Sequence, residues 1–169
     1  LSYSDIFKAQ FYKMYSSNNK KDQFIEKWRD LEAICSEIFQ TKAGSPMDEL
    51  FTRYMYYERA LMGNKNTTTE ALRKFYEKDN YKLLKKAGVF NNLMELAGFW
   101  NDIENQEQNK FSENVLRKLF VLNYAPNGMW TYFTSVYFMH YKDDEGLLNQ
   151  DKFNDFLGKS IAFIWTYAI

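Results

Sequence analysis

The chain has 169 residues, of which 46% are hydrophobic and 19% aromatic, so it can bury a sizeable core and does not resemble an aromatic-poor disordered chain. It carries 22 Lys and Arg against 22 Asp and Glu, and this zero net charge disfavours a domain whose main task is to neutralise nucleic-acid phosphates. Only 7 Gly and 2 Pro are present, which disfavours a sandwich or barrel of many short strands and favours long helices.

The cysteine content and the apolar stretches indicate a compartment. A single cysteine, Cys35, cannot form an internal disulfide, which favours the reducing cytoplasm. The most apolar stretches, 129–141 and 160–169, are shorter than the roughly 20 residues that a membrane helix needs, so no membrane partner is expected. The chain begins inside a helix-start pattern without a methionine and stops in an apolar run. We therefore expect a cytoplasmic fragment of a longer protein.

The first half of the chain shows three helix patterns. Ser2 and Asp5 have the spacing of a capping box, which predicts a helix start there. Residues 21–40 carry an amphipathic stripe, and the segment from Ser45 and Pro46 to about 62 has a strong start signal and stops at Gly63. The stripe of the second helix consists of Phe24, Trp28, Leu31, Cys35 and Ile38.

The second half continues the helical pattern. Thr68 or Thr69 can cap the next helix, and Gly88 ends a pair of short helices broken near Asp79 and Asn80. The expected later helices are 91–103, a helix capped by Ser112 and reaching 124, 129–141, and a last helix from about 150. The chain is thus expected to form an all-α fold, an irregular bundle of about seven to nine helices in a single domain spanning 1–169.

Two apolar helices suggest burial or association. Nearly every position from 129 to 141 is apolar or aromatic, which predicts a central helix buried on all sides. Residues 160–169 carry no charge, and their apolar side chains point in several directions around a helix. Phe163, Trp165 and Tyr167 are therefore interface candidates, and we expect this helix either to lie centrally or to form a self-association surface in a homo-oligomer.

Signatures of catalysis are missing from the sequence. The only histidine, His140, lies on the aromatic helix and is interpreted as structural, and Cys35 as a small buried hydrophobe. No zinc set, nucleophile triad or phosphate-binding glycine loop is present, and the acidic run 143–145 lacks the spacing of a calcium loop. We therefore expect no catalytic, metal or cofactor site, and no enzyme activity for this chain alone.

One charge pattern remains. Four lysines recur at steps of four and would form a basic ridge on a continuous helix: Lys74, Lys78, Lys82 and Lys86. Such a ridge could follow a phosphate backbone, whereas a solvated helix face is the commoner explanation. We expect DNA to bind only weakly, or through other parts of a longer protein.

Several short motifs resemble the Gmr-type restriction proteins of prokaryotes, in which a ParB-like nucleotide-hydrolysing domain is often joined to an HNH-type nuclease. The opening residues resemble the "LSxxDIxK" stretch that begins the helical region of that family: Leu1, Ser2, Asp5, Ile6, Phe7 and Lys8. Similar segments follow at 47–54, 67–69, 75–78 and 124–130.

The resemblance covers essentially the whole chain and implies the helical middle of such a protein. The family's nucleotide motif would lie upstream and its nuclease residues downstream, so no family catalytic residue falls on this chain. Two functions therefore remain open. One is a non-catalytic scaffold between the nucleotidase and the nuclease, with these flanking domains as partners; the other is a stand-alone nucleic-acid-binding module that uses the four lysines.

Overall fold

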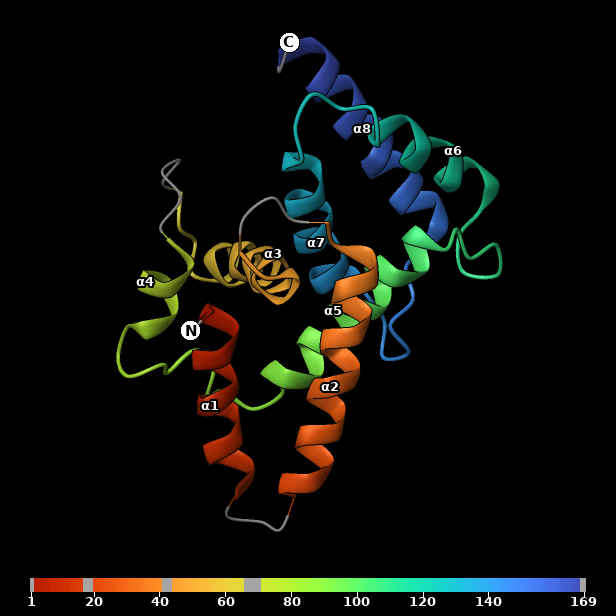
Figure 1. Ribbon diagram of the computed structural model, residues 1–169. Helices are drawn as coiled ribbons and strands as arrows, with labels where there is room; N and C mark the ends of the chain where they lie inside the picture. Colours follow the sequence, from red (N-terminus) through yellow and green to blue (C-terminus); the bar gives the residue numbers. More distant parts are fainter. Residues whose placement is uncertain (1, 17–19, 41–43, 66–70, 168–169) are drawn as a thin grey trace. The chain divides into compact units, whose positions relative to one another are not determined.

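A computed structural model of the chain describes residues 2–16, 20–40, 44–65 and 71–167. These residues form eight α-helices and include no strand, which confirms the all-helical prediction (Figure 1). Contacts divide the chain into two compact units, unit 1 (Leu1–Gly98) and unit 2 (Phe99–Ile169), and the boundary lies inside α5 (Val89–Glu104). The stretch expected to form one domain thus contains two compact units.

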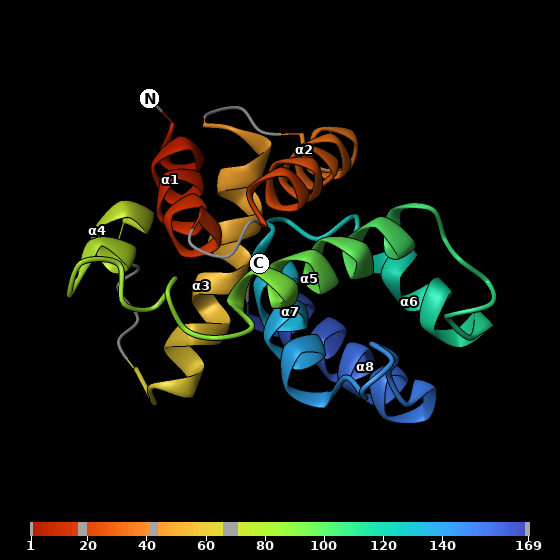
Figure 2. The same ribbon diagram turned by 90° about the horizontal axis from the view of Figure 1, so that it is seen from below.

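Unit 1 is built on three long helices and one short one. Helices α1 and α2 are antiparallel neighbours, and α3 packs against both of them (Figures 1 and 2). The short α4 packs against α3. The helices are α1 (Tyr3–Ser16), α2 (Lys21–Ile38), α3 (Pro46–Leu61) and α4 (Leu72–Glu77), followed by the first part of α5.

Capping side chains fix the helix starts that the sequence predicts. The Ser2 backbone N–H donates to the Asp5 carboxylate at 3.1 Å, and the Asp5 N–H donates to the Ser2 hydroxyl at 3.3 Å. Ser45 and Asp48 make the same reciprocal pair at 3.2 Å in front of α3. Such boxes satisfy two of the N–H groups that a helix start leaves unpaired. The expected caps Thr68 and Thr69 lie outside the described residues.

The core of unit 1 is a cluster of aromatic rings. Phe11 lies with its ring centroid 5.5 Å from that of Phe90, and Phe24 lies 5.2 Å from Phe90 on another side. Phe51 lies 6.4 Å from Phe11 and 6.3 Å from Trp28. These five rings come from α1, α2, α3 and α5 and are at most 4% exposed. Helices distant in sequence are therefore joined by tilted and stacked aromatic contacts.

The segment between α4 and α5 differs from the expected second short helix. Asp79, Asn80 and Tyr81 have φ values of 50°, 55° and 61°, in the left-handed region. Three consecutive left-handed residues stop a right-handed helix, and Asp and Asn adopt this conformation most easily. From 81 to 88 the chain continues in turns with short-range bonds, such as the 3.1 Å bond from the Leu84 N–H to the Tyr81 carbonyl. The predicted break near 79–80 is present, but the helix expected after it is not.

Unit 2 contains the last part of α5 and three further helices, α6 (Glu113–Leu122), α7 (Met129–Tyr141) and α8 (Gln150–Tyr167). The Ser112 hydroxyl caps α6 as predicted, while its N–H donates to the Gln150 side chain at 2.9 Å. Further along, the Lys118 ammonium donates to the Asn154 amide oxygen at 2.7 Å. These two contacts run in the same order along both helices, so α6 and α8 are parallel, and both views show them side by side (Figures 1 and 2).

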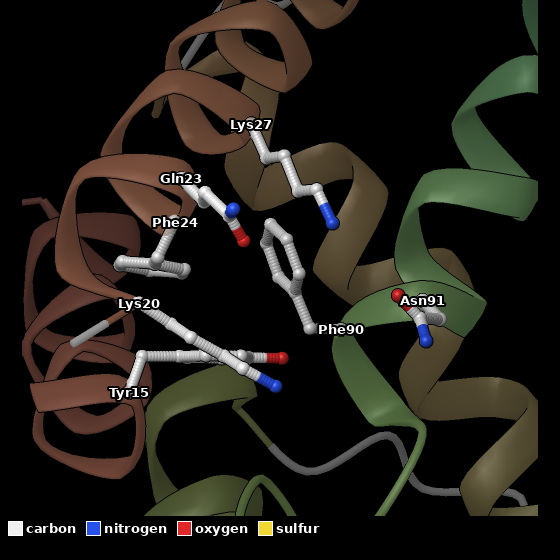
Figure 3. A pocket seen from close by; sticks show the side chains of 7 residues that line it. All are labelled: Tyr15, Lys20, Gln23, Phe24, Lys27, Phe90 and Asn91. Atoms are coloured by element: carbon white, nitrogen blue, oxygen red, sulfur yellow. The ribbon is translucent and has the colours of Figure 1, made fainter. Parts of the chain in front are cut away.

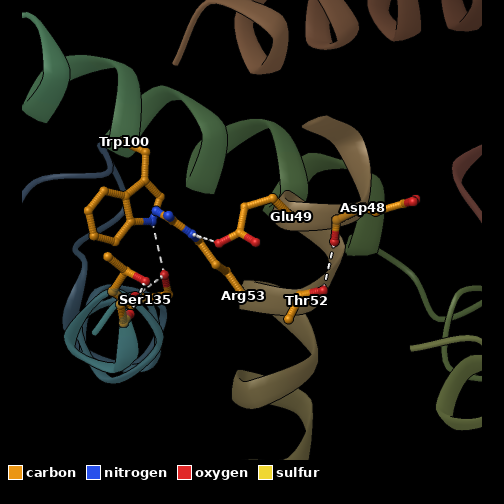
Figure 4. Close-up of polar contacts among 8 residues, drawn as sticks. Asp48, Glu49, Thr52, Arg53, Trp100 and Ser135 are labelled. Carbon is orange, nitrogen blue, oxygen red and sulfur yellow. Dashed lines mark hydrogen bonds and ion pairs between the residues drawn. The ribbon is translucent and has the colours of Figure 1, made fainter. Parts of the chain in front are cut away.

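Helix α7 contributes its polar residues to the interior of unit 2. Ser135 is fully buried, and its hydroxyl accepts a 2.9 Å hydrogen bond from the Trp100 indole and donates to the Thr131 carbonyl at 2.7 Å (Figure 4). Next to it, Phe138 stacks on Phe99 with ring centroids 4.1 Å apart. These contacts connect α7 to the end of α5.

The expectation that α7 is buried on all sides is wrong. Met129 is 37% exposed, Phe133 43% and Tyr141 58%, while the polar Thr134 is completely buried. Unit 2 has too few helices to surround α7, because a small unit buries a smaller share of its surface. The apolar sequence of α7 therefore reflects two faces, one packed inside unit 2 and one open.

Candidate interaction surface

The three interface candidates of α8 are exposed. Phe163 is 54% exposed, Trp165 37% and Tyr167 76%, whereas Ile164 between them is 4% exposed. Over residues 162–167 only Ile164 is buried. Since one apolar stripe is enough to attach a surface helix, these three aromatic side chains exceed what the packing of α8 uses. The exposure of the last turns does not agree with a central position of this helix, and the association surface stays a prediction.

Further exposed apolar side chains lie at the same end of unit 2. Because α6 and α8 are parallel and packed together, their C-terminal ends lie at one end of the unit, and α7 begins there after a short connection. Phe120 and Tyr124 make a ring contact of 5.4 Å, and Phe163 and Tyr167 make another of 5.4 Å. We call this set the apolar end of unit 2: Phe120, Tyr124, Met129, Phe133, Phe163, Trp165 and Tyr167.

The apolar end is also free of formal charge. No Asp, Glu, Lys or Arg occurs between Lys118 and Lys142, or from 160 to 167. The opposite ends of α6 and α8 carry charged side chains, including the Arg117–Glu113 ion pair at 2.5 Å. Exposed apolar surface without interspersed charge is typical of sites that bind another protein.

The four lysines do not lie on one helix. Lys74 belongs to α4, which ends at Glu77, and the other three lie in the turns after it. All four side chains are exposed. The Lys86 ammonium lies 3.6 Å from the Glu58 carboxylate, and Lys78 lies over the Phe75 ring at 5.8 Å. The structure therefore lacks the continuous helix from which the ridge was predicted.

Three titratable side chains of unit 1 are buried in its core, and burial raises the pKa of each. Cys35 is fully buried, as predicted, and burial raises the pKa of its thiol to about 12, against an opposing effect of Arg53. Burial also raises the pKa of Tyr54 and of Tyr76, both near the buried Glu58. A thiol with such a high pKa is not a nucleophile at neutral pH.

The remaining residues singled out in the sequence lie at the surface of unit 2. His140 is exposed, and its ring lies 4.6 Å from the ring of Tyr141. The Asp143 carboxylate accepts backbone hydrogen bonds from Glu145 at 2.9 Å and from Leu147 at 2.8 Å, so it organises a turn. In the part of the chain that the structure describes, no group of three or more His, Cys, Asp or Glu side chains is placed to hold a metal ion.

The side-chain contacts at the start of α3 include two within that helix, besides the 3.1 Å hydrogen bond from the Ser4 N–H of α1 to the Asp48 carboxylate. The Arg53 guanidinium donates to Glu49 at 2.9 Å, and the Thr52 hydroxyl donates to the Asp48 carbonyl at 2.8 Å (Figure 4). The ion pair joins side chains four positions apart, a spacing that stabilises a helix by about 0.2–0.5 kcal/mol. The Thr52 hydroxyl instead bonds a backbone carbonyl and adds no such stabilisation.

The sequence missed most of the apolar end. Phe120, Tyr124, Met129 and Phe133 were expected to lie in buried or capped helices, although the absence of charge between Lys118 and Lys142 could have marked them.

No family model matches the chain, and no curated protein or solved structure matches it. Among the described residues, none of the helices combines the length and the apolar character that crossing a membrane requires.

Proposed function

We propose that this chain is a non-catalytic helical scaffold that binds a protein partner through the apolar end of unit 2. The observation that carries the proposal is the exposure of Phe163, Trp165 and Tyr167 on an end without formal charge. Aromatic residues are enriched at protein interfaces, because they contribute large contact areas at a small entropic cost.

The size of the expected interaction supports this assignment. Burying one large apolar side chain contributes about 1.5–3 kcal/mol. Association itself costs roughly 4–15 kcal/mol in lost translational and rotational freedom. A single side chain stays below the lower bound of that cost, whereas the seven residues of the apolar end together exceed it. A partner therefore has to cover several of these side chains.

The resemblance of the opening motif suggests which partner this is. Leu1, Ser2 and Asp5 belong to the stretch that resembles the helical region of Gmr-type restriction proteins. In this proposal, the chain connects a ParB-like nucleotidase to an HNH-type nuclease in an anti-phage restriction protein, and one of these flanking domains covers the apolar end. DNA then contacts the whole protein mainly outside this chain.

The alternative, a nucleic-acid-binding module, has less support. It depended on a single basic ridge, and α4 ends at Glu77 before three of the four lysines. Lys86 is in addition paired with Glu58. No observation favours this function over the scaffold.

The reading frame that encodes the chain provides the first test. We expect it to encode a nucleotide-hydrolysing domain before Leu1 and a nuclease domain after Ile169. A reading frame that encodes neither of these two domains would overturn the restriction assignment.

The second test uses the whole protein with the double substitution Phe163→Ser and Tyr167→Ser. We expect nucleotide-dependent DNA cleavage to fall by about tenfold or more, equivalent to about 1.4 kcal/mol of coupling, while nucleotide hydrolysis stays unchanged. The matched control replaces Leu61 and Met62, which are 58% and 52% exposed in unit 1, with serine. Equal losses in both double variants would contradict a specific role for the apolar end.

A further inference from the structure

Unit 1 contains a cavity of about 260 Å³ whose lining is polar and basic (Figure 3). Four lining residues come from the start of α2, two from the first turn of α5 and one from the last turn of α1. They are Lys20, Gln23, Phe24 and Lys27, then Phe90 and Asn91, and Tyr15. This cavity belongs to unit 1 alone and is unrelated to the apolar end of unit 2.

The polar side chains of the cavity are available for a ligand. Lys20, Gln23, Lys27 and Asn91 are exposed, and their side chains make no hydrogen bond or ion pair with the described residues. In Figure 3 the lysine side chains enter the cavity from opposite sides, with Phe90 between them. Every one of these four groups can donate hydrogen bonds.

The charge of the cavity selects an anion. None of the seven lining residues is acidic, so two ammonium groups face the space without a carboxylate to neutralise them. Both α2 and α5 begin here, and each helix N-terminus adds about half a positive charge. The C-terminal end of α1 at Tyr15 contributes about half a negative charge, which is much smaller than the two full charges of the lysines. The cavity therefore attracts a ligand with about two negative charges.

The two phenylalanines at the back of the cavity strengthen the attraction for an anion, but they have no free face on which an aromatic ligand could stack. Phe24 and Phe90 are 1% and 4% exposed, because their faces are used in contacts with each other and with Trp28. They offer little area for stacking, but they lower the local dielectric constant, so charges interact more strongly there than in open water.

The available space is larger than a bare phosphate requires. A second cavity of about 170 Å³ adjoins the first and shares Tyr15, Lys20 and Phe90 with it. Ligand sites in proteins typically start at about 300 Å³, a size that the two cavities reach only together. An anion attached to a small organic group fits this arrangement better than an inorganic ion.

We propose that this cavity binds a phosphate ester, with Lys20 and Lys27 contacting the phosphate and Gln23 and Asn91 donating further hydrogen bonds. This binding goes beyond the scaffold function and is independent of it. The phosphate can come from a free nucleotide or from the backbone of a single-stranded nucleic acid, and both sources present the same group.

Isothermal titration calorimetry on the intact chain at low salt tests the proposal, with AMP, adenosine, inorganic phosphate and a single-stranded oligothymidylate as probes. We expect AMP to bind at least about tenfold more tightly than adenosine, which lacks the phosphate, and more tightly than inorganic phosphate, which leaves part of the space empty. Oligothymidylate binding that exceeds that of AMP would identify nucleic acid as the source, and the reverse order would identify a free nucleotide. Equal affinities for AMP and adenosine, or no binding of any phosphorylated probe, would overturn the proposal.

Substitutions test whether the phosphorylated probes bind in this cavity. Replacing Lys20 and Lys27 with glutamine should weaken binding of the phosphorylated probes by about tenfold or more, and the isosteric Gln23→Glu change should weaken it in the same direction. Replacing the exposed Lys152 and Lys159 of unit 2 with glutamine removes the same charge and should leave binding unchanged. An equal loss in this control would show that the net charge of the chain, and not the cavity, attracts the probes.

Discussion

The two units bury their aromatic residues to different extents. Among the described residues, the large apolar side chains that remain exposed in unit 1 are Tyr3, Leu61 and Met62. The described part of the shorter unit 2 has ten: Phe120, Val121, Tyr124, Met129, Phe133, Tyr141, Leu147, Phe163, Trp165 and Tyr167. The aromatic residues therefore form a closed core in unit 1, whereas in unit 2 many of them lie on the surface.

The number of packed layers explains this difference. In unit 1, α1, α2 and α3 all contact one another, so rings such as Phe11 and Phe51 are enclosed from several sides. In unit 2, α8 packs extensively on α6 and makes only a small contact with α7. With fewer neighbours, the second apolar face of α7 remains open, and so does the end of α8. A partner would complete the burial that unit 2 lacks.

The largest expected effect comes from the core of unit 1. Replacing Phe51, which is fully buried, with alanine should lower the free energy of unfolding by about 3–5 kcal/mol, because it removes apolar contacts and leaves a cavity. Urea unfolding followed by circular dichroism measures this loss. The matched change Phe163→Ala in unit 2 should stay within about 0.5 kcal/mol, as expected for a surface residue. Similar losses in both variants would remove the distinction between the units.

Alkaline pH should lower the stability of unit 1 more than that of unit 2. Unfolded cysteine ionises near pH 8.5, but burial raises the pKa of folded Cys35 to about 12, so the folded state keeps a proton that the unfolded state loses. Stability is therefore unaffected below about pH 8.5 and falls by about 1.4 kcal/mol per pH unit above it, with the buried Tyr54 and Tyr76 adding to the loss above about pH 10.

Single-tryptophan variants can report this pH dependence for each unit. A variant that retains only Trp28 reports unit 1, and one that retains only Trp130 reports unit 2. We expect the fluorescence of Trp28 to change at lower pH than that of Trp130, and Cys35→Ala to shift the Trp28 transition upward. Coincident transitions that do not respond to the Cys35 change would contradict this expectation.

A smaller effect is expected at the start of α3. Ser45→Ala removes one half of the capping box with Asp48, together with the 3.2 Å hydrogen bond between the Ser45 and Ser4 hydroxyls, and should lower the free energy of unfolding by about 1 kcal/mol. Thermal unfolding measures this loss. Ser36→Ala provides the control, because the Ser36 hydroxyl donates to the Glu32 carbonyl inside α2 and does not cap a helix start. If Ser45→Ala and Ser36→Ala change the melting temperature equally, the cap does not contribute as described.

The smallest effect is expected for the four lysines. Changing Lys74, Lys78, Lys82 and Lys86 to glutamate should alter DNA binding little, because the wild-type chain has no net charge and these lysines do not share a helix. Fluorescence anisotropy with labelled duplex DNA at several salt concentrations measures this binding. A salt-dependent affinity of the wild type tighter than about micromolar, lost in the variant, would support the nucleic-acid alternative.

Local signals in the sequence were sufficient for most of the fold. Ser45 and Pro46 fixed the start of α3, and Gly63 with a φ of 65° follows its end. The stripe that contains Trp28 and Cys35 is buried as its spacing predicts, except at Ile38, which is half-buried. These features depend on residues within one or two turns of each other, so the sequence contains them directly.

Features that depend on neighbours from other helices could not be predicted in this way. The open face of α7 at Phe133 results from how few helices surround it, which its own composition cannot indicate. The cavity between Lys20, Lys27 and Asn91 needs the starts of α2 and α5 to meet, although these starts are about seventy residues apart in the sequence. The break near Asp79 was predicted, but the turns that follow its left-handed residues take the place of the second short helix that was expected there.

Sedimentation velocity of the isolated chain over a range of concentrations tests the central claim, that the apolar end of unit 2 is a binding surface. A second copy is the only partner available there, and zero net charge does not oppose association. We expect the sedimentation coefficient to rise with concentration for the wild type and for the Leu61→Ser, Met62→Ser control. The rise should be absent for Trp165→Glu and for Phe163→Ser, Tyr167→Ser, with melting temperatures unchanged. A wild-type coefficient that does not change with concentration, or an equal loss in the control, would contradict the account.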